Sequence, residues 1–154
     1  MLLKNFGVPS GKLWKFNFRM DYGHQGGKNM FEKFDVSLPV IKDIMFDIRD
    51  YGAVGDGVTS NTQMFKDAIC AAAECGGRVL VPDGIWLTGP IELLSGVELH
   101  LSDNALITFS KNKEEYPLIV TDYEGIKRIR TQSMIYADNA KDIAITGKGT
   151  IDGN

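Results

Sequence analysis

Acidic side chains occur in pairs at two places where they could act together as a general acid and a general base. Asp138 and Asp142 flank a turn, and Glu114 stands beside Glu115 among lysines. Two-carboxylate catalysis needs one group protonated and the other ionised at the same bond. Aspartates in turns usually accept hydrogen bonds from nearby backbone amides. We therefore interpret these side chains as structural and predict no catalytic residue in this chain.

One histidine and two cysteines are further candidates for chemistry. His100 lies between Leu99 and Leu101 in an alternating stretch, so we expect it to point outward from a strand, where it is solvated or lines a wall. No second metal ligand stands at a usable spacing. On one helix, Cys70 and Cys75 would be separated by about 7.5 Å of axial rise, too far for a disulfide. We predict two small buried side chains, no metal site and no cofactor.

A glycine-rich loop, Gly52-x-x-Gly55-x-Gly57, precedes a predicted helix and could in principle cradle a phosphate. A dinucleotide site requires G-x-G-x-x-G, with the pyrophosphate at the helix N-terminus. The glycine order here differs, further residues intervene before Ser60, and no second helix is predicted after the next strand. We interpret the loop as a turn.

The composition narrows the class of protein. The chain has 154 residues, of which 44% are hydrophobic and 24% are charged, and its net charge is −3. These values are typical of a globular domain and exclude a disordered, collagen-like or coiled-coil chain. The negative charge argues against a nucleic-acid partner, and no apolar run approaches the roughly 18 residues of a membrane span. Without a signal peptide we expect a cytoplasmic protein, or a secreted or periplasmic one if the natural chain begins elsewhere.

The elements divide the chain into two parts. Residues 1–43 form an N-terminal extension of unknown role, with an alternating strand pattern at 14–20 before a turn-rich stretch. In residues 44–154 the spacing predicts an α-helix at about 61–75, capped by the Ser60 or Asn61 side chain and ended by Gly76-Gly77. No large hairpin is expected beyond it. Short strands are predicted at residues 78–81, 85–87, 90–93, 97–101, 106–109, 134–137, 143–146 and 150–151.

Short strands without crossover helices favour a solenoid of parallel coils. Seven motifs stand out in residues 44–154: DYGAVGDG at 50–57, GGRVLVPDG at 76–84, LTGPIEL at 87–93, SGVELHL at 95–101, TDYEG at 121–125, IYA at 135–137 and IAITGKGTIDGN at 143–154. By these motifs the segment resembles the N-terminal part of glycoside hydrolase family 28, the polygalacturonases of the pectin-lyase-like superfamily. Residues 121–125 and 135–137 are similar to the bacterial exo-acting branch.

The resemblance implies a mainly β fold, namely the first coils of a right-handed parallel β-helix with an N-terminal capping helix. It also implies inverting, metal-free hydrolysis of α-1,4-galacturonide bonds by two carboxyl groups about 6.5–9.5 Å apart. The family's Asn-Thr-Asp, Asp-Asp, Gly-His-Gly and Arg-Ile-Lys motifs are absent from this sequence. We expect them beyond Asn154, so the chain resembles the inactive front portion of a longer enzyme.

An acidic polysaccharide or oligogalacturonide substrate would be attracted by the basic side chains of Lys127, Arg128 and Arg130. A solvated run of charges explains the same residues without a function. Tyr123 and Glu124 belong either to the wall of a substrate cleft or to a buried turn. As substrate-binding residues we predict Tyr123, Glu124 and Arg128.

Two other functions stay open. A non-catalytic β-helix module, binding polysaccharide or forming part of a tailspike-like assembly, would bind sugar without releasing reducing ends. A pectate lyase would need a calcium site, and the sequence shows no acidic cluster for one.

Overall fold

A computed structural model describes residues 38–154. The strand and turn predicted within residues 14–27 lie outside the described residues. The unit considered below spans Pro39–Asn154. Its elements, in chain order, are β1 (Met45–Asp47), the 3-10 helix η1 (Ile48–Tyr51), α1 (Thr62–Cys75), β2 (Gly77–Val81), β3 (Gly84–Thr88), β4 (Ile91–Glu92), β5 (Val97–Leu101), β6 (Ala105–Phe109), the 3-10 helix η2 (Lys113–Glu115), β7 (Leu118–Tyr123), β8 (Ile126–Thr131), β9 (Ile135–Tyr136), β10 (Ala144–Gly147) and β11 (Thr150–Asp152).

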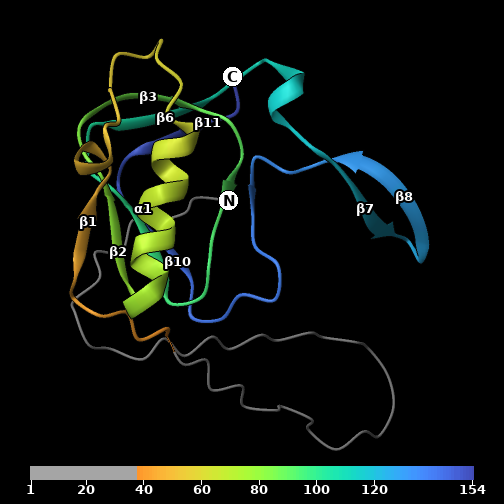
Figure 1. The fold of residues 1–154 in the computed structure, drawn as a ribbon, viewed down its shortest axis with the longest axis horizontal. Coiled ribbons are helices and arrows are strands. Elements are labelled where there is room, and N and C mark those ends of the chain that lie inside the picture. The colour runs from red at the N-terminus through yellow and green to blue at the C-terminus, as the bar shows by residue number, and fades with distance from the viewer. Residues whose placement is uncertain (1–37) are drawn as a thin grey trace, which may run out of the picture. The chain divides into compact units, whose positions relative to one another are not determined.

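Strands from successive coils pair in parallel and form three sheets. The first sheet has the order β1-β2-β5-β10, the second β11-β6-β3, and the third pairs β4 with β9. Two turns of the chain, β2-β3-β4 and β5-β6-β9, each contribute one strand to each sheet. In the first sheet β1 precedes them, and β10 and β11 stack after them in the first and second sheets (Figure 1). This arrangement is the start of a right-handed parallel β-helix and confirms the predicted fold class.

Inward-facing side chains form rows across the coils, because residues at matching strand positions pair in register. Val79 pairs with Leu99, and Leu99 with Ile145; the first two are fully buried, whereas Ile145 is 46% exposed. Each row thus begins in the core and ends at the last described coil, where no further strand pairs with it.

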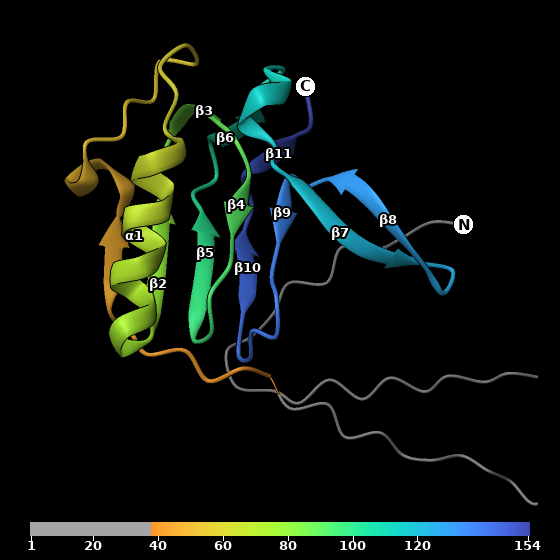
Figure 2. The same cartoon turned by 45° about the vertical axis from the view of Figure 1, so that its right-hand side comes forward.

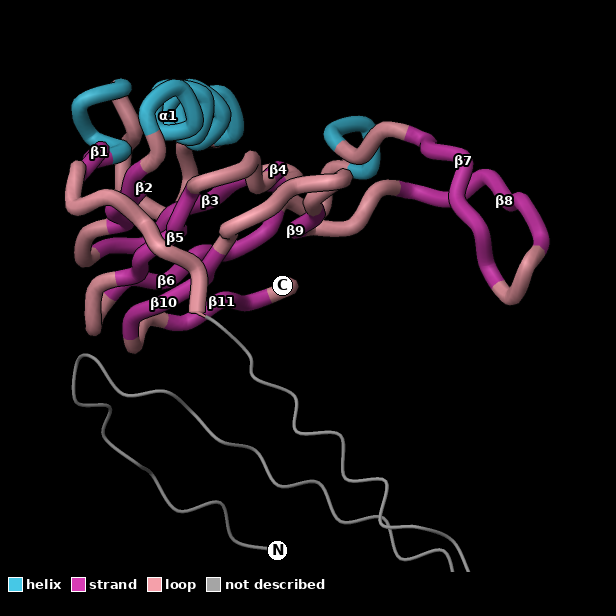
Figure 3. Tube along the Cα trace, turned by 90° about the horizontal axis from the view of Figure 1, so that it is seen from below, coloured by secondary structure: helices cyan, strands magenta, loops and turns pink. Residues whose placement is uncertain are grey.

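The helix α1 covers the other end of the stack, as Figure 3 shows. It buries one apolar face, consisting of Phe65, Ala68, Ile69 and Ala72. Two glycines end the helix for different reasons. Gly76 adopts a φ of +77°, and a Cβ on Gly77 would lie 2.8 Å from the Ile44 carbonyl oxygen. The predicted helix is confirmed, with Asn61 at its N-cap position.

Two side-chain predictions around this helix are wrong. The side chain of Asn61 makes no capping hydrogen bond with the first turn, because it bonds the preceding loop and β3 instead. Cys70 is exposed, and Cys75 is half-buried rather than buried. Successive helical residues are about 100° apart, so Cys70 turns outward while its neighbour Ile69 faces the core.

A large antiparallel hairpin, formed by β7 and β8, interrupts the second coil, contrary to the sequence expectation. Figures 1 and 2 show it extending away from the stacked strands. Its two turn residues, Glu124 and Gly125, have φ angles of +52° and +79°. Positive φ at both central residues is typical of the type I′ turn, which suits the twist of a two-residue hairpin loop.

Candidate functional site

The predicted binding residues lie at the distal end of the hairpin. Arg128 of β8 is opposite Thr121, and Tyr123 of β7 is opposite Ile126. Glu124 forms the turn between the strands. The structure does not describe the Tyr123 side chain, and the binding role of all three residues stays a prediction.

The basic residues of β8 do not form one cluster. Side chains alternate along a strand, which places Arg128 and Arg130 on one face and Lys127 on the other. Lys127 stands opposite Asp122 in the hairpin register. The arginine face is therefore the part of the hairpin suited to a carboxylate ligand, because an arginine can bind both oxygens of a carboxylate.

A pocket of about 640 Å³ lies at the base of the hairpin. Its lining combines two lysines with hydroxyl and amide groups, and among the described residues that line it none is acidic. The lining residues are Ser110, Lys111, Lys113, Tyr116, Thr131, Gln132, Ser133, Met134, Gly153 and Asn154.

The wall of this pocket is held by hydrogen bonds to the segment before the hairpin. Ser110 Oγ donates to Glu115 Oε1 at 2.7 Å, and the Tyr116 hydroxyl donates to the Ser110 carbonyl oxygen at 2.7 Å. Burial and the nearby Glu115 carboxylate both raise the pKa of Tyr116, so its hydroxyl stays protonated and keeps donating at neutral pH. At the hairpin base, the backbone amide of Gln132 donates to the Pro117 carbonyl oxygen at 2.9 Å.

The described lining of this pocket carries groups that suit ligand binding. Lys111 and Lys113 supply positive charge, and the neutral groups can exchange hydrogen bonds with sugar hydroxyls. Two-carboxylate hydrolysis requires a pair of acidic groups at the reacting bond, and no described acidic side chain lines the pocket. The pocket therefore suits an anionic, hydroxylated ligand and supplies no catalytic pair.

His100 belongs to a network of polar side chains on β2, β5 and β10 of the first sheet. Thr146 Oγ1 donates to Glu98 Oε1 at 2.5 Å, and His100 Nδ1 lies 2.6 Å from Thr146 Oγ1. Because the Thr146 proton is used on Glu98, His100 Nδ1 is the donor to Thr146. Arg78 Nε lies 3.0 Å from Glu98 Oε2. His100 is half-buried on the outward side, and the structure ties it to its neighbours instead of leaving it solvated.

Neither a metal centre nor a membrane helix is found in the part of the chain that the structure describes. No three His, Cys, Asp or Glu side chains gather there as a metal site would require. The helices of residues 38–154 are too short or too polar to cross a membrane. Of the paired carboxylates that the sequence offers as an acid and a base, Asp138 accepts a hydrogen bond from the side-chain Nδ2 of Asn139 at 2.8 Å.

Sequence reasoning missed the pocket because it missed the hairpin. Lys111 and Lys113 are distant in sequence from Gln132 and Ser133, and only the β7–β8 pairing brings them to one pocket. The available signal was the near-symmetric stretch of β-forming residues on each side of Glu124-Gly125. Glu-Gly is not a favoured pair for a type I′ turn, for which Asn-Gly and Asp-Gly are typical.

Comparison with known proteins identifies the family of these coils. Residues 45–150 match the family described as rhamnogalacturonase A/epimerase, pectate lyase-like. The chain belongs to this family. Among solved structures, the chain is similar to a hyperthermoactive exopolygalacturonase from Thermotoga maritima, with 40% identity and a TM-score of 0.71 over 77% of this chain and 27% of that one.

Two further proteins are similar to this chain. A family 28 exopolygalacturonase from Yersinia enterocolitica is 34% identical, with a TM-score of 0.64, over 73% of this chain and 21% of that one. An exo-poly-alpha-D-galacturonosidase from Dickeya chrysanthemi is 31% identical over 96% of this chain, so that match extends well into residues 1–43, and it covers 26% of the relative. The resemblance to bacterial exo-polygalacturonases is confirmed, and the chain spans about a quarter of the relatives' length.

Proposed function

We propose that this chain is the N-terminal part of a glycoside hydrolase that removes galacturonate units from the ends of pectin-derived chains. The observation that carries the proposal is the 31–40% identity to three exo-acting polygalacturonases, which extends over most of the coils described here. In this assignment the α-1,4-galacturonide bond is hydrolysed with inversion by two carboxyl groups.

The chemistry of the hairpin and its base supports an acidic substrate. Each unit of polygalacturonate carries one carboxylate and several hydroxyls. The pocket at the hairpin base offers the matching groups, namely two lysines and several hydrogen-bonding side chains. The hairpin adds Arg128 and Arg130 on one face. In the proposed enzyme, this region binds substrate, with Tyr123, Glu124 and Arg128 at its distal end.

These 154 residues alone are expected to bind without hydrolysing. The four family motifs that supply and position the acid and the base are absent from the sequence. A pocket that binds a sugar acid without a proton donor at the glycosidic oxygen leaves the bond intact.

The test begins with the protein isolated from its own cells, whose intact mass is compared with 17.0 kDa. That protein and the 154-residue chain are each incubated with polygalacturonate, and the released sugars are separated by chromatography. We expect the natural protein to have a larger mass and to release small galacturonides from chain ends, and the short chain to release none.

Three results would overturn the proposal. Saturable binding without new reducing ends in the natural protein would indicate a non-catalytic polysaccharide-binding module. Unsaturated, ultraviolet-absorbing products would indicate a lyase. A natural protein of 17.0 kDa would remove the place where the missing carboxylates are expected.

A further inference from the structure

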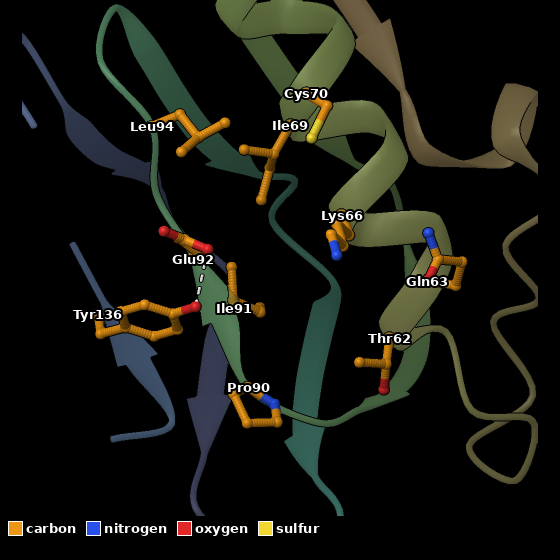
Figure 4. Close-up of a pocket in the computed structure, with 10 residues that line it drawn as sticks. All are labelled: Thr62, Gln63, Lys66, Ile69, Cys70, Pro90, Ile91, Glu92, Leu94 and Tyr136. Carbon is orange, nitrogen blue, oxygen red and sulfur yellow. Dashed lines mark hydrogen bonds between the residues drawn. The ribbon is translucent and has the colours of Figure 1, made fainter. Parts of the chain in front are cut away.

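A second pocket lies between the helix α1 and the sheet of β4 and β9, and it shares no lining residue with the pocket at the hairpin base. Its volume is about 250 Å³. Figure 4 shows the side chains of the helix on one side and those of the two strands on the other. The lining residues are Thr62, Gln63, Lys66, Ile69, Cys70, Pro90, Ile91, Glu92, Leu94 and Tyr136.

The strand side of this pocket carries a hydrogen-bonded pair. Glu92 and Tyr136 occupy matching positions of β4 and β9, and the Tyr136 hydroxyl donates to Glu92 Oε2 at 2.8 Å. Figure 4 shows this bond beside the open space. Burial of Tyr136 and its bond to Glu92 raise the pKa of the tyrosine, so the hydroxyl remains a donor at neutral pH. The second oxygen of Glu92 stays available to accept from a ligand.

The helix side contributes one available cation. Thr62 Oγ1 already accepts from the Gly89 amide at 2.7 Å, and Gln63 Nε2 donates to Asp67 Oδ1 at 2.7 Å. Lys66 is exposed on α1 and has no ion pair with any residue that the structure describes. Of the polar groups on the helix side, the Lys66 ammonium is therefore the one placed to meet a ligand.

The combination of groups selects a kind of ligand. A purely apolar molecule would desolvate Lys66 and Glu92 without compensation. A small dianion would meet repulsion from the Glu92 carboxylate. A ring with one carboxylate and several hydroxyls satisfies both charges, while Ile91 and Leu94 contact its apolar C–H surface. The volume is below the range of about 300–1,000 Å³ typical of sites for drug-sized ligands, which suits a single sugar ring.

We propose that this pocket binds one uronic acid unit of an acidic glycan, with Lys66 pairing with the sugar carboxylate and Glu92 accepting from ring hydroxyls. The choice of galacturonate as the uronic acid rests on the proposed function. The site would hold glycan away from the hairpin-base pocket and takes no part in bond cleavage.

Cys70 provides a local readout of occupancy. It is exposed and lines this pocket, whereas the half-buried Cys75 does not line it. The full chain is treated with limiting iodoacetamide at increasing concentrations of galacturonate or trigalacturonate, and alkylation at each cysteine is followed by mass spectrometry. We expect the ligands to slow alkylation of Cys70 and leave that of Cys75 unchanged, while galactose, which lacks the carboxylate, has little effect.

Substitutions at Lys66 test the recognised group. Lys66→Met removes the charge with a side chain of similar helix propensity, and the galacturonate concentration needed for half-protection should rise about tenfold, as expected for a lost charge-assisted hydrogen bond. Lys66→Arg should retain protection. Lys141→Met removes an exposed lysine outside the pocket and is the matched control, which should behave as the parent.

The inference is overturned if galacturonate and trigalacturonate leave Cys70 alkylation unchanged, if galactose protects equally well, or if Lys66→Met and Lys141→Met behave alike. Protection of Cys70 in the 154-residue chain and hydrolysis by the natural protein are separate measurements. If the natural protein hydrolyses polygalacturonate but Cys70 is not protected, this inference alone is contradicted. If Cys70 is protected but the natural protein does not hydrolyse polygalacturonate, the proposed function alone is contradicted.

Discussion

Asn61 is a fully buried polar side chain at the point where the long loop meets α1. Its Oδ1 accepts from the Val54 amide at 2.7 Å, and its Nδ2 lies within hydrogen-bonding distance of the carbonyl oxygens of Val54, Thr59 and Leu87. One side chain thus closes the loop on itself and attaches it to β3. This loop covers the edge of β3, which pairs on its other side with β6.

Replacing this asparagine should destabilise the fold strongly. In Asn61→Ala the Val54 amide loses its partner in a buried site, and an unsatisfied buried group costs about 1–3 kcal/mol. With several bonds lost at once, we expect a loss of about 2–4 kcal/mol in the free energy of unfolding, measured by urea denaturation. Asn104→Ala removes an exposed asparagine bonded to Asp83 and should change stability by less than about 0.5 kcal/mol. Equal effects of the two changes would show that the Asn61 bonds contribute little.

For single residues, the sequence predicts the position in an element better than the direction and the hydrogen-bond partners of the side chain. The sequence predicts Asn61 at the start of the helix, where the structure has it. Whether its side chain bonds the first turn or the loop depends on the position of β3. Cys70 fits an apolar helix face by residue type, yet its outward direction follows from how α1 rotates onto the coils. Both outcomes depend on tertiary packing that no local pattern contains.

The hairpin is the element that departs most from sequence expectation and that builds the larger pocket. Its turn uses Glu124 and Gly125, both at positive φ. An ideal Cβ on Gly125 would meet no atom within 4 Å. A side chain at position 125 would therefore cost free energy only through the backbone conformation of the turn. We expect the destabilisation to be confined to the hairpin.

Gly125→Ala should loosen the hairpin without unfolding the coils. A non-glycine residue in the left-handed region costs about 1–2 kcal/mol, and 1.4 kcal/mol corresponds to a factor of ten. We expect amide hydrogen exchange in β7 and β8 to become about tenfold faster, with Val79 and Leu99 unchanged. Gly52→Ala, at another positive φ without nearby atoms, is the control and should not affect the hairpin. Accelerated exchange throughout the coils would contradict this picture.

Elements with a regular period were predictable, and the hairpin was not. The apolar spacing of residues 64–75 predicted α1, and alternation in residues 97–101 predicted β5, because each element buries one face against the core. In β8 every residue is exposed, so burial imposes no alternation on its sequence. From the sequence alone, the basic residues of this stretch therefore indicate a charged cluster beside a turn and no strand.

In the unit as a whole, one end of the coil stack is covered by α1 and the other end presents the outer strands of the sheets. At the α1 end, β1 pairs with β2, the loop at Asp56 pairs with β3, and α1 packs on β4. At the opposite end, β9, β10 and β11 are the outer strands of their sheets in the described unit. Side chains such as Ile145 and Ile151 (46% and 40% exposed) lie on these strands. Unpaired strand edges with apolar residues promote association with other chains.

The chain in isolation should therefore associate through this end, and charges placed there should prevent it. We expect sedimentation velocity to show concentration-dependent association of the parent chain. Lys at strand edges opposes pairing, so the double variant Ile145→Lys, Ile151→Lys should shift the distribution toward monomer. The matched control, Val40→Lys with Val58→Lys, adds the same charge at exposed positions outside these strands and should associate as the parent does. If both double variants dissociated equally, net charge would be responsible. A parent chain that stayed monomeric at all concentrations would show that the strand edges do not recruit a partner.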